Sequence, residues 1–347
     1  MLLRRLMSTS TKPTVLRLGQ VAYAQEAWAE LEKIANVIVN DSPNREQFLQ
    51  DLKGKYSNVD YITRTFPSVT QTGLFDAELV SHLPESVKAV CHNGAGYDQV
   101  DPHALLTKNI QLSNVPELVD NATADTHVFL LLGALRNFNA GHEALLKGEW
   151  AQVRKAAAGT PVANDPEGKT VGIVGLGAIG RNILSKLKPF GFKKFVYHNR
   201  NRLPEDQENG AEYVSLDELL ATSDIISINI PLNKHTTHFF NEEKFSKMKQ
   251  GVVVVNTARG GVIDETAFIK YLKSGHIRSA GLDVMQNEPD VNLELVNLPN
   301  VLALPHMGTH SFETIKKMEE FVVENVKSLI ETGKVISLVP EQKAHDF

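Results

Sequence analysis

The sequence is poor in cysteine, and this scarcity indicates the kind of compartment in which the protein works. The chain has 347 residues and one cysteine, Cys91, so a disulfide cannot form within it. Cys91 stands in the apolar run 87–91, which is typical of a buried and inert thiol. The sequence therefore indicates a reducing compartment, and we expect a cytoplasmic protein.

Long apolar segments and basic blocks are also missing. The longest apolar stretch, residues 128–135, is far shorter than the ~20 residues that a membrane-spanning helix needs. The formal net charge is -5, and the lysines and arginines are scattered among acidic residues, which is not the pattern of a nucleic-acid-binding protein. We therefore expect no membrane and no nucleic acid as a partner, and a small-molecule ligand fits best.

Acidic side chains are absent from the amino-terminal segment. No aspartate or glutamate precedes Glu26, while Arg4 and Arg5 stand close to several serines and threonines. This composition is typical of a mitochondrial presequence, and a disordered tail is the alternative for residues 1–12. A second start at Met7 would remove both arginines, so a cytoplasmic protein with a possible mitochondrial form is compatible with one gene.

Short runs rich in valine and isoleucine alternate with helical stretches over almost the whole chain. This rhythm predicts a parallel α/β architecture, and a chain of this length exceeds what one hydrophobic core usually organises, so we expect two domains. In the first part, strands are expected at 14–18, 36–39, 59–63, 87–92 and 110–112. In the second part, strands are expected at 170–174, 194–197, 225–230, 252–256, 279–284 and 301–304.

Two helices are predicted together with their ends. Asp120 and Asn121 can cap a helix over residues 122–135, whose alanines and leucines make it a rigid connector. The last helix begins at Ser311, places its apolar residues on one face, and stops at Gly333. We expect this last helix to return to the first domain.

A glycine-rich turn follows directly on the expected strand at 170–174 and precedes an expected helix. Its first glycine permits a tight turn, its second lets the backbone approach a pyrophosphate, and its third allows the helix to pack closely on the strand. Free amides at the positive helix end complete a dinucleotide site, and an ordinary glycine-rich turn is the alternative. The residues expected to contact the cofactor here are Gly175, Gly177, Ala178, Ile179 and Gly180.

The next expected strand lacks an acid at its end. About twenty residues after the glycines, an NAD-selective site carries a carboxylate that holds the ribose 2′-hydroxyl, but this chain reads Tyr197-His198-Asn199-Arg200. Asn199 does not repel a 2′-phosphate, and Arg200, together with Arg202, can pair with one. A solvated surface loop is the alternative. The sequence therefore favours NADPH, with NADH possible.

Charged or titratable side chains follow three other expected strands of the second part. Arg259 can bind a substrate carboxylate through two hydrogen bonds, as lysine does not. His306 can protonate a ketone oxygen as a hydride arrives, because histidine titrates near the working pH, and Glu288 can favour the charged imidazole. Each residue alone is also compatible with an ordinary exposed arginine or loop histidine.

His306 and His310 are four positions apart, which on a helix would suggest a metal pair. Pro305 and Gly308 place them in a loop instead, and the HExxH pattern of helical zinc sites is absent from the sequence. We therefore expect no metal site.

Taken together, four segments resemble the D-isomer-specific 2-hydroxyacid dehydrogenase family. They are residues 170–181, 253–261, 281–284 with 288–289, and 304–308. The resemblance implies a flavodoxin-like substrate domain of residues 13–115 with 316–347, completed by the C-terminal helix. It also implies a Rossmann-type, doubly wound NAD(P)-binding domain of residues 116–315.

The resemblance also implies individual roles. Arg259 becomes the substrate anchor, and Glu288 and His306 become the acid pair. The segment 93–98 looks like the substrate loop of the family, whose amides, here at Gly94 and Ala95, would hold a carboxylate. The residues that the resemblance places near the cofactor are Ile230, Pro231, Thr257, Ala258, Asp283 and Gly308.

Within the family, the missing acid is similar to the glyoxylate and hydroxypyruvate reductases, and the whole chain looks like the fungal glyoxylate reductase group. This implies reduction of a small 2-keto acid, glyoxylate or hydroxypyruvate, to the 2-hydroxy acid, glycolate or D-glycerate. Family members are usually dimers that associate through the cofactor domain. A homodimer is therefore implied, in which Trp150 would reach the active site of the partner.

Two alternatives remain at this point. Residues 197–205 also resemble the cofactor loop of NAD-dependent formate dehydrogenases, but those enzymes carry glutamine where Glu288 stands, so formate oxidation is disfavoured. A nucleotide-sensing regulatory protein of the same fold would keep the same motifs. The sequence has no long low-complexity tail or basic patch that would favour a regulator, and an assay of turnover would separate the two.

Overall fold

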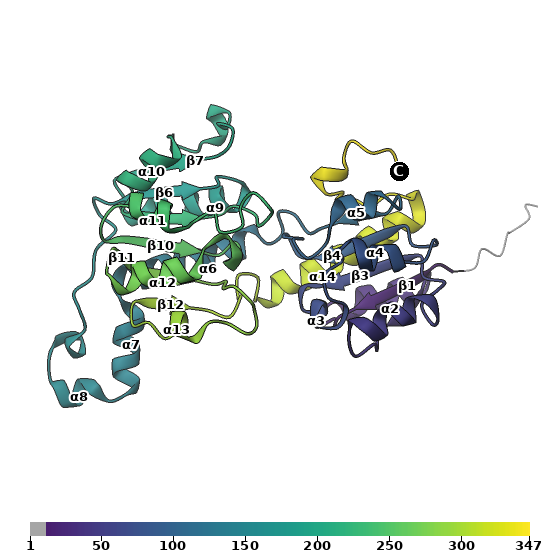
Figure 1. The fold of residues 1–347 in the computed structure, drawn as a ribbon, viewed down its shortest axis with the longest axis horizontal. Coiled ribbons are helices and arrows are strands. Elements are labelled where there is room, and N and C mark those ends of the chain that lie inside the picture. The colour runs from purple at the N-terminus through teal and green to yellow at the C-terminus, as the bar shows by residue number, and fades with distance from the viewer. Residues whose placement is uncertain (1–11) are drawn as a thin grey trace, which may run out of the picture. The chain divides into compact units, whose positions relative to one another are not determined.

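The computed structural model describes residues 12–347 (Figure 1). The chain divides into two compact units: unit 1 is formed by residues up to 118 with 311–347, and unit 2 by residues 119–310. The expected amino-terminal tail lies, apart from Lys12, outside the described residues. None of the helices within 12–347 combines the length and the apolar character needed to cross a membrane.

Unit 1 contains a parallel sheet of five strands. They are β1 (Thr14–Leu18), β2 (Asn36–Val39), β3 (Tyr61–Thr65), β4 (Ala89–Asn93) and β5 (Gln111–Ser113). The order is β2-β1-β3-β4-β5, which is the flavodoxin-like order. β3 begins and ends two residues later than predicted, because the buried Arg64, followed by Thr65, continues the strand beyond its apolar part.

Six α-helices cover this sheet. They are α1 (Gln25–Glu32), α2 (Arg45–Lys53), α3 (Val69–Thr72), α4 (Ala77–His82), α5 (Pro102–Leu106) and α14 (Phe312–Thr332). As predicted, α14 belongs to this unit; Ser311 Oγ caps its first turn, and it ends at Gly333 with φ 77°. Its buried Glu319 accepts hydrogen bonds from the amides of Ala22, Tyr23 and Ala24 at 2.7–2.8 Å, so α14 holds the loop that leads into α1.

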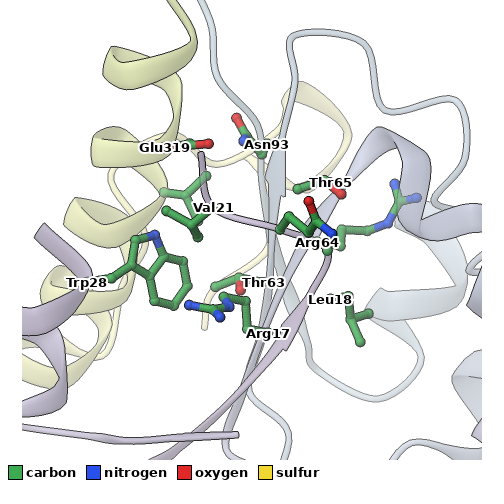
Figure 2. Close-up of a pocket in the computed structure, with 12 residues that line it drawn as sticks. Arg17, Leu18, Val21, Trp28, Thr63, Arg64, Thr65, Asn93 and Glu319 are labelled. Atoms are coloured by element: carbon green, nitrogen blue, oxygen red, sulfur yellow. The ribbon is translucent and has the colours of Figure 1, made fainter. Parts of the chain in front are cut away.

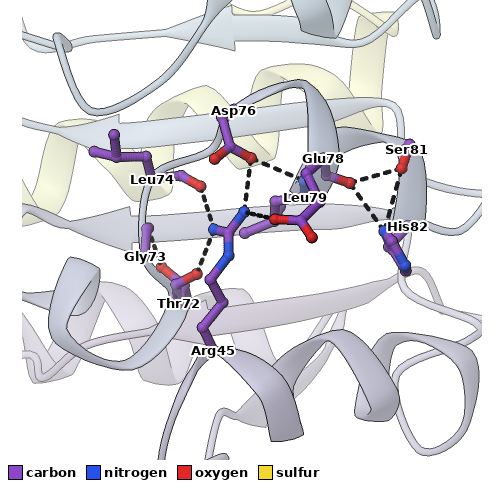
Figure 3. Close-up of polar contacts among 9 residues, drawn as sticks. All are labelled: Arg45, Thr72, Gly73, Leu74, Asp76, Glu78, Leu79, Ser81 and His82. Carbon is purple, nitrogen blue, oxygen red and sulfur yellow. Dashed lines mark hydrogen bonds and ion pairs between the residues drawn. The ribbon is translucent and has the colours of Figure 1, made fainter.

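The guanidinium of Arg45, the first residue of α2, fixes the segment that leads to α4 (Figure 3). Its Nη1 donates to the carbonyl oxygens of Thr72 (3.0 Å) and Leu74 (2.7 Å). Its Nη2 pairs with the carboxylates of Asp76 (2.7 Å) and Glu78 (2.9 Å). One side chain thus binds two backbone carbonyl oxygens and two carboxylates of this segment.

Unit 2 contains a parallel sheet of seven strands. They are β6 (Thr170–Val174), β7 (Lys194–His198), β8 (Glu212–Tyr213), β9 (Ile225–Ile228), β10 (Val252–Asn256), β11 (Ile277–Leu282) and β12 (Val301–Ala303). The order is β12-β11-β10-β9-β6-β7-β8, a doubly wound Rossmann order. The prediction of an α/β protein with two parallel sheets is confirmed. The two-residue β8 was not predicted, since it is too short to show a periodicity.

Helices cover both faces of the sheet of unit 2: α6 (Asp120–Arg136) and α9 (Ala178–Leu187) share one core with it, and α10 (Leu216–Thr222), α11 (Glu242–Lys247), α12 (Glu265–Lys273) and α13 (Leu293–Val296) share the other. The helices α7 (Phe138–Leu146) and α8 (Glu149–Val153) extend away from the sheet (Figure 1). Alternate valines of β10 belong to two separate hydrophobic cores: Val252 and Val254 to one, Val253 and Val255 to the other. A strand buried on both faces reads as a continuous apolar run.

The predicted cap of α6 is wrong. The helix begins at Asp120 itself, Val119 is the capping residue, and no side chain caps the first turn. The backbone is already helical at Val119, so Asp120 and Asn121 lie inside the helix, where an acidic residue still favours the amino-terminal end. The helix packs closely on β11, because a Cβ on Gly281 would lie 2.7 Å from the carbonyl oxygen of Leu130.

Candidate active site

The glycine-rich sequence forms the tight turn between β6 and α9. Gly175 has φ 98°, a left-handed conformation that favours glycine, and a Cβ there would lie 2.7 Å from the carbonyl oxygen of Asn229. A Cβ on Gly180 would lie 2.4 Å from the carbonyl oxygen of Gly175, so the helix packs directly on the turn. A Cβ on Gly177 would meet nothing within 4 Å, which leaves open space beside the backbone.

The amino-terminal end of α9 suits an anion. Gly177 is its capping residue, and no side chain hydrogen-bonds to the first turn. The first-turn amides of Ala178, Ile179 and Gly180 therefore lack helical partners, and they carry the positive end of the helix dipole. Together with the open space at Gly177, this turn fits the pyrophosphate of a dinucleotide.

At the end of β7, Asn199, Arg200 and Arg202 were predicted to accommodate a 2′-phosphate. The structure leaves only some of these side chains available for it. Asn199 Oδ1 accepts a hydrogen bond from the amide of Leu176 at 2.7 Å, so it closes the glycine turn. Arg202 is engaged elsewhere, since its Nε and Nη2 lie 2.7 and 3.2 Å from the two carboxylate oxygens of Glu208. Arg200 is exposed. Of the two arginines considered for a 2′-phosphate, Arg200 is thus the better placed.

Asp283, directly after β11, shapes the loop that carries His306. Its carboxylate accepts hydrogen bonds from the amides of Met307 (2.6 Å) and Gly308 (2.7 Å). Its own carbonyl oxygen accepts one from the amide of His306 at 2.8 Å. Asp283 is 1% exposed, and this burial raises the pKa of its carboxyl group. The side chain therefore holds the backbone of residues 306–308 in place.

His306 and Glu288 form a close pair. Nδ1 of the imidazole lies 2.6 Å from Oε2 of Glu288, and Oε1 of Glu288 accepts a hydrogen bond from the amide of Met285 at 2.9 Å. A carboxylate can only accept, so Nδ1 carries a hydrogen, and Nε2 is the ring atom that can carry a transferable proton. Both side chains are partly buried. The pair has the form of an oriented acid.

Arg259 follows β10 in a turn that Asn256 holds. The buried Asn256 accepts from the amide of Ala258 (3.0 Å) and donates to the carbonyl oxygen of Arg259 (2.9 Å). A Cβ on Gly260 would lie 2.0 Å from the carbonyl carbon of Met285. The turn of Arg259 and the segment that binds Glu288 are therefore in backbone contact.

The expected substrate loop, residues 93–98, lies in unit 1 after β4. The amide of Gly94 donates to the carbonyl oxygen of His92 at 3.1 Å, so it is already used within the protein. The amide of Ala95 donates to no protein acceptor within residues 12–347. Of the two amides expected to hold a carboxylate, that of Ala95 is the one left for a ligand.

A small cavity lies in unit 1 at the carboxyl ends of β1 and β3 (Figure 2). Its volume is about 20 Å³, which accommodates about one water molecule and is far below the volume of a substrate pocket. Arg17 Nε, Trp28 Nε1 and Thr63 Oγ1 are buried without a protein partner among the described residues. The side chain of Arg64 points away from this cavity. The cavity thus suits a bound water.

Comparison with known proteins identifies the family. A model of the D-isomer specific 2-hydroxyacid dehydrogenase NAD binding domain matches residues 128–308, more than half of the chain. The chain belongs to the D-isomer specific 2-hydroxyacid dehydrogenase family. The family and the enzyme class predicted from the sequence are thereby confirmed.

Three proteins show how closely other dehydrogenases of this family resemble the chain. Glyoxylate reductase 1 of Saccharomyces cerevisiae is 58% identical over 342 residues, which cover 97% of each chain. The crystal structure of a glyoxylate reductase from Paecilomyes thermophila has a TM-score of 0.91 and 45% identity, over 96% of this chain and 100% of that one. An NADPH-dependent glyoxylate/hydroxypyruvate reductase from Sinorhizobium meliloti, in complex with NADP and malonate, has a TM-score of 0.83 and 28% identity, over 95% and 98%.

The dehydrogenase also has a buried polar network that was not predicted from the sequence. His127 of α6 lies 2.8 Å from Thr257 Oγ1 and 2.8 Å from Ser227 Oγ, which also accepts from Asn229 at 2.8 Å. Burial lowers the pKa of His127 to about 3, so the ring is neutral near neutral pH. The network connects the ends of β9 and β10. The only sequence signal is a histidine at the start of an otherwise apolar helical stretch.

Contacts between described residues bring most of the predicted site of this dehydrogenase together. In unit 2, Arg259, Glu288, His306, Asp283 and Gly308 are joined by the hydrogen bonds and the backbone contact described above. Ile230 lies beside the glycine turn, with Cγ2 3.1 Å from the position of a Cβ on Gly175. Residues 12–347 contain no cluster of three or more histidine, cysteine or acidic side chains able to hold a metal ion.

Proposed function

We propose that this dehydrogenase reduces glyoxylate to glycolate, with hydroxypyruvate, which would give D-glycerate, as a second substrate. The observation that carries the proposal is the pair of His306 Nδ1 and Glu288 Oε2, 2.6 Å apart, beside the turn of Arg259. This is the arrangement of a proton donor next to a carboxylate anchor. The names of the Saccharomyces cerevisiae and Paecilomyes thermophila reductases support the choice of substrate.

Each side chain of the site has one proposed task. Arg259 holds the substrate carboxylate through charge-assisted hydrogen bonds. In unit 1, the amide of Ala95 is the proposed substrate donor of the loop after β4. His306 donates the proton on Nε2 to the carbonyl oxygen, and Glu288 orients the ring. The dinucleotide, when bound, supplies the hydride that C2 accepts. Residues proposed to line its nicotinamide are Ile230, Pro231, Thr257, Ala258, Asp283 and Gly308.

We propose NADPH as the preferred cofactor, with NADH accepted less well. Two features support this: β7 ends without a carboxylate that would repel a 2′-phosphate, and the exposed Arg200 stands directly after Asn199. The related reductase of Sinorhizobium meliloti is described as NADPH-dependent and was crystallised with NADP. The comparisons give no support to formate oxidation or to a nucleotide-sensing regulator.

We also propose a homodimer located in the cytoplasm. α7 and α8 carry several large apolar side chains at the surface, among them Leu146, 73% exposed, and Trp150, 55% exposed. Apolar side chains gathered at a surface are typical of a protein interface. A second copy of this chain is the proposed occupant, with Trp150 near the active site of the partner.

Steady-state kinetics with NADPH or NADH, each against glyoxylate and hydroxypyruvate, test the reaction class, the substrate and the cofactor together. We expect both keto acids to be reduced, with a higher kcat/KM for NADPH than for NADH. A preference for NADH would contradict only the role given to Asn199 and Arg200. Dinucleotide binding without reduction of any small 2-keto acid would contradict the proposed function and favour a regulator.

A further inference from the structure

Three successive carbonyl groups in the loop after β4 are each held by a hydrogen-bond donor. The carbonyl oxygen of Gly94 accepts from the amide of Val115 at 2.9 Å. That of Ala95 accepts from Asn114 Nδ2 at 2.8 Å. That of Gly96 lies 2.9 Å from His92 Nε2. The orientation of three consecutive peptide planes is therefore fixed by contacts within unit 1.

The fixed carbonyls determine where the next amides point. In a trans peptide unit the N–H is directed opposite to the C=O, so the amides of Ala95, Gly96 and Tyr97 face away from those donors. Within residues 12–347, none of these three amides donates to a protein acceptor. Free amides on successive residues are donors from which a carboxylate can accept hydrogen bonds. Their orientation depends on the side chains that hold the carbonyl groups.

Among the donors that hold these carbonyl groups, His92 is special because its two partners determine which ring nitrogen carries the hydrogen. Arg64 Nη1 lies 3.0 Å from His92 Nδ1. A guanidinium has only donors, so Nδ1 must accept; Nε2 then carries the hydrogen and donates to Gly96, whose carbonyl oxygen only accepts. Both side chains are 1% exposed. The contact therefore selects one neutral tautomer of His92.

Arg64 is itself held rigidly. Its Nη2 donates to Gln99 Oε1 at 2.5 Å, and its guanidinium lies 5.5 Å from the ring centroid of Phe75. Burial lowers the pKa of Arg64 to about 10, which still leaves the side chain charged near neutral pH. A buried charge is costly unless it is hydrogen-bonded; here Nη1 and Nη2 are bound to His92 and Gln99, while Nε has no partner among the described residues.

The loop lies directly on the imidazole. A Cβ on Gly94 would be 2.7 Å from His92 Nε2, closer than real Cβ atoms approach. The ring thus fills the space in which any larger residue at position 94 would have to fit. A shift of His92 is therefore transmitted to the backbone of the loop.

We propose that Arg64 and His92 are positioning residues that orient the amides of residues 95–97 toward the carboxylate of the keto-acid substrate. Arg64 fixes the tautomer of His92, and His92 fixes the peptide plane that ends in the Tyr97 amide. This inference rests on the proposed function, because it assigns the substrate carboxylate to this loop. Neither side chain touches the substrate.

The first test is Arg64→Met, which keeps much of the side-chain volume but removes the donor to His92 Nδ1. We expect the KM for glyoxylate to rise about 10-fold or more, the effect of one weakened charge-assisted hydrogen bond, with little change in kcat. The dissociation constant of NADPH should stay at its wild-type value. Oxalate, used as a non-reacting carboxylate probe, should bind the NADPH complex more weakly by a similar factor.

Thr63→Val is the matched control. Thr63 precedes Arg64 on β3, is equally buried, and its hydroxyl has no partner among the described residues. The substitution should leave both KM and oxalate binding unchanged. An equal rise in KM for this control would show that any change in β3 disturbs the loop, and it would overturn the inference.

A pair of His92 variants tests the inference independently, also where Arg64→Met does not fold. Glutamine offers one acceptor and one donor, as the selected tautomer of His92 does, whereas leucine offers neither. We expect His92→Gln to recover much of the substrate affinity that His92→Leu loses. Equal KM values for the two variants, or losses in kcat and NADPH binding instead of KM, would overturn the inference. A wild-type protein that reduces no keto acid would instead contradict the proposed function.

Discussion

At the residue scale, the chemistry of the site depends on a few side chains whose hydrogen bonds leave them one orientation. Glu288 uses one carboxylate oxygen for the amide of Met285 and the other for His306. Asp283 uses both oxygens for the backbone that follows His306. Because the imidazole is held from its side chain and from its backbone, its Nε2 is presented in a fixed direction.

Arg259→Lys tests the carboxylate anchor. A lysine keeps the positive charge but loses the planar pair of donors, so the carboxylate is held by a single contact. We expect the KM for glyoxylate to rise by about 10-fold or more, while the dissociation constant of NADPH remains unchanged. The control is Arg278→Lys in the same unit, where the guanidinium donates to the carbonyl oxygen of Val162. A wild-type KM in Arg259→Lys would contradict the anchor.

Single residues also mark what the sequence could and could not predict. The glycine turn, Glu288 and His306 were predictable, because each follows a strand or belongs to a motif. His127 and Asn256 were not, because their importance comes from partners that only the folded chain brings near, such as Thr257 and the backbone of Arg259. The amide of Gly94 was expected to be available, but a local turn uses it.

At the element scale, strand interiors were more predictable than strand ends. β1, β2, β6 and β10 have the predicted bounds, and each is built around a short apolar run. β11 starts and ends two residues earlier than predicted, because Asp283 and Val284 leave the sheet to form the site. The cap of α6 was misplaced, since the helix begins at Asp120, two residues earlier than predicted, and no local signal indicates this.

The carboxylate of Asp224, just before β9, binds the first residue of β6 and a lysine that precedes β10. From these contacts we predict how the stability of the protein depends on pH. Its carboxylate accepts from the amide of Thr170 (2.8 Å) and from Lys249 Nζ (2.7 Å). Burial opposes its ionisation, but the hydrogen bonds from Lys249 and Thr170 outweigh it, and the pKa of Asp224 is lowered. A lowered folded-state pKa stabilises the protein above the unfolded pKa of about 4, and this stability is lost as the pH falls through the folded value.

Asp224→Asn should therefore lower the free energy of unfolding by about 1–3 kcal/mol at neutral pH. The difference from the wild type should shrink as the pH falls below about 4. Urea unfolding of both proteins across this range is the measurement. The control is Asp217→Asn, which removes an exposed carboxylate paired with Lys247. A difference between wild type and Asp224→Asn that is independent of pH would contradict the account.

At the scale of the whole molecule, the length of the chain and the alternation of strands and helices predicted two parallel sheets. The flavodoxin-like and Rossmann orders of these sheets came from the family resemblance, and not from periodicity alone. Periodicity cannot give the order of strands, because parallel neighbours are set by crossovers between distant segments.

The proposed homodimer predicts a change of mass. Leu146→Asp places a charge among the exposed apolar side chains of α7 and α8, so burial there would be costly. We expect the wild type to sediment as a dimer and Leu146→Asp to sediment largely as a monomer. Ile336→Asp, at an exposed apolar position in unit 1 (55% exposed), is the control and should remain dimeric. A wild-type monomer at micromolar concentration would contradict the proposal.

The most direct test of the central claim compares glyoxylate reduction by the wild type and by His306→Ala, followed as the oxidation of NADPH. If His306 donates the proton while Glu288 holds it, His306→Ala should lower kcat by at least ~100-fold. The binding of NADPH to the variant should remain that of the wild type, because the glycine turn is untouched. A variant that reduces glyoxylate at the wild-type rate would contradict the account.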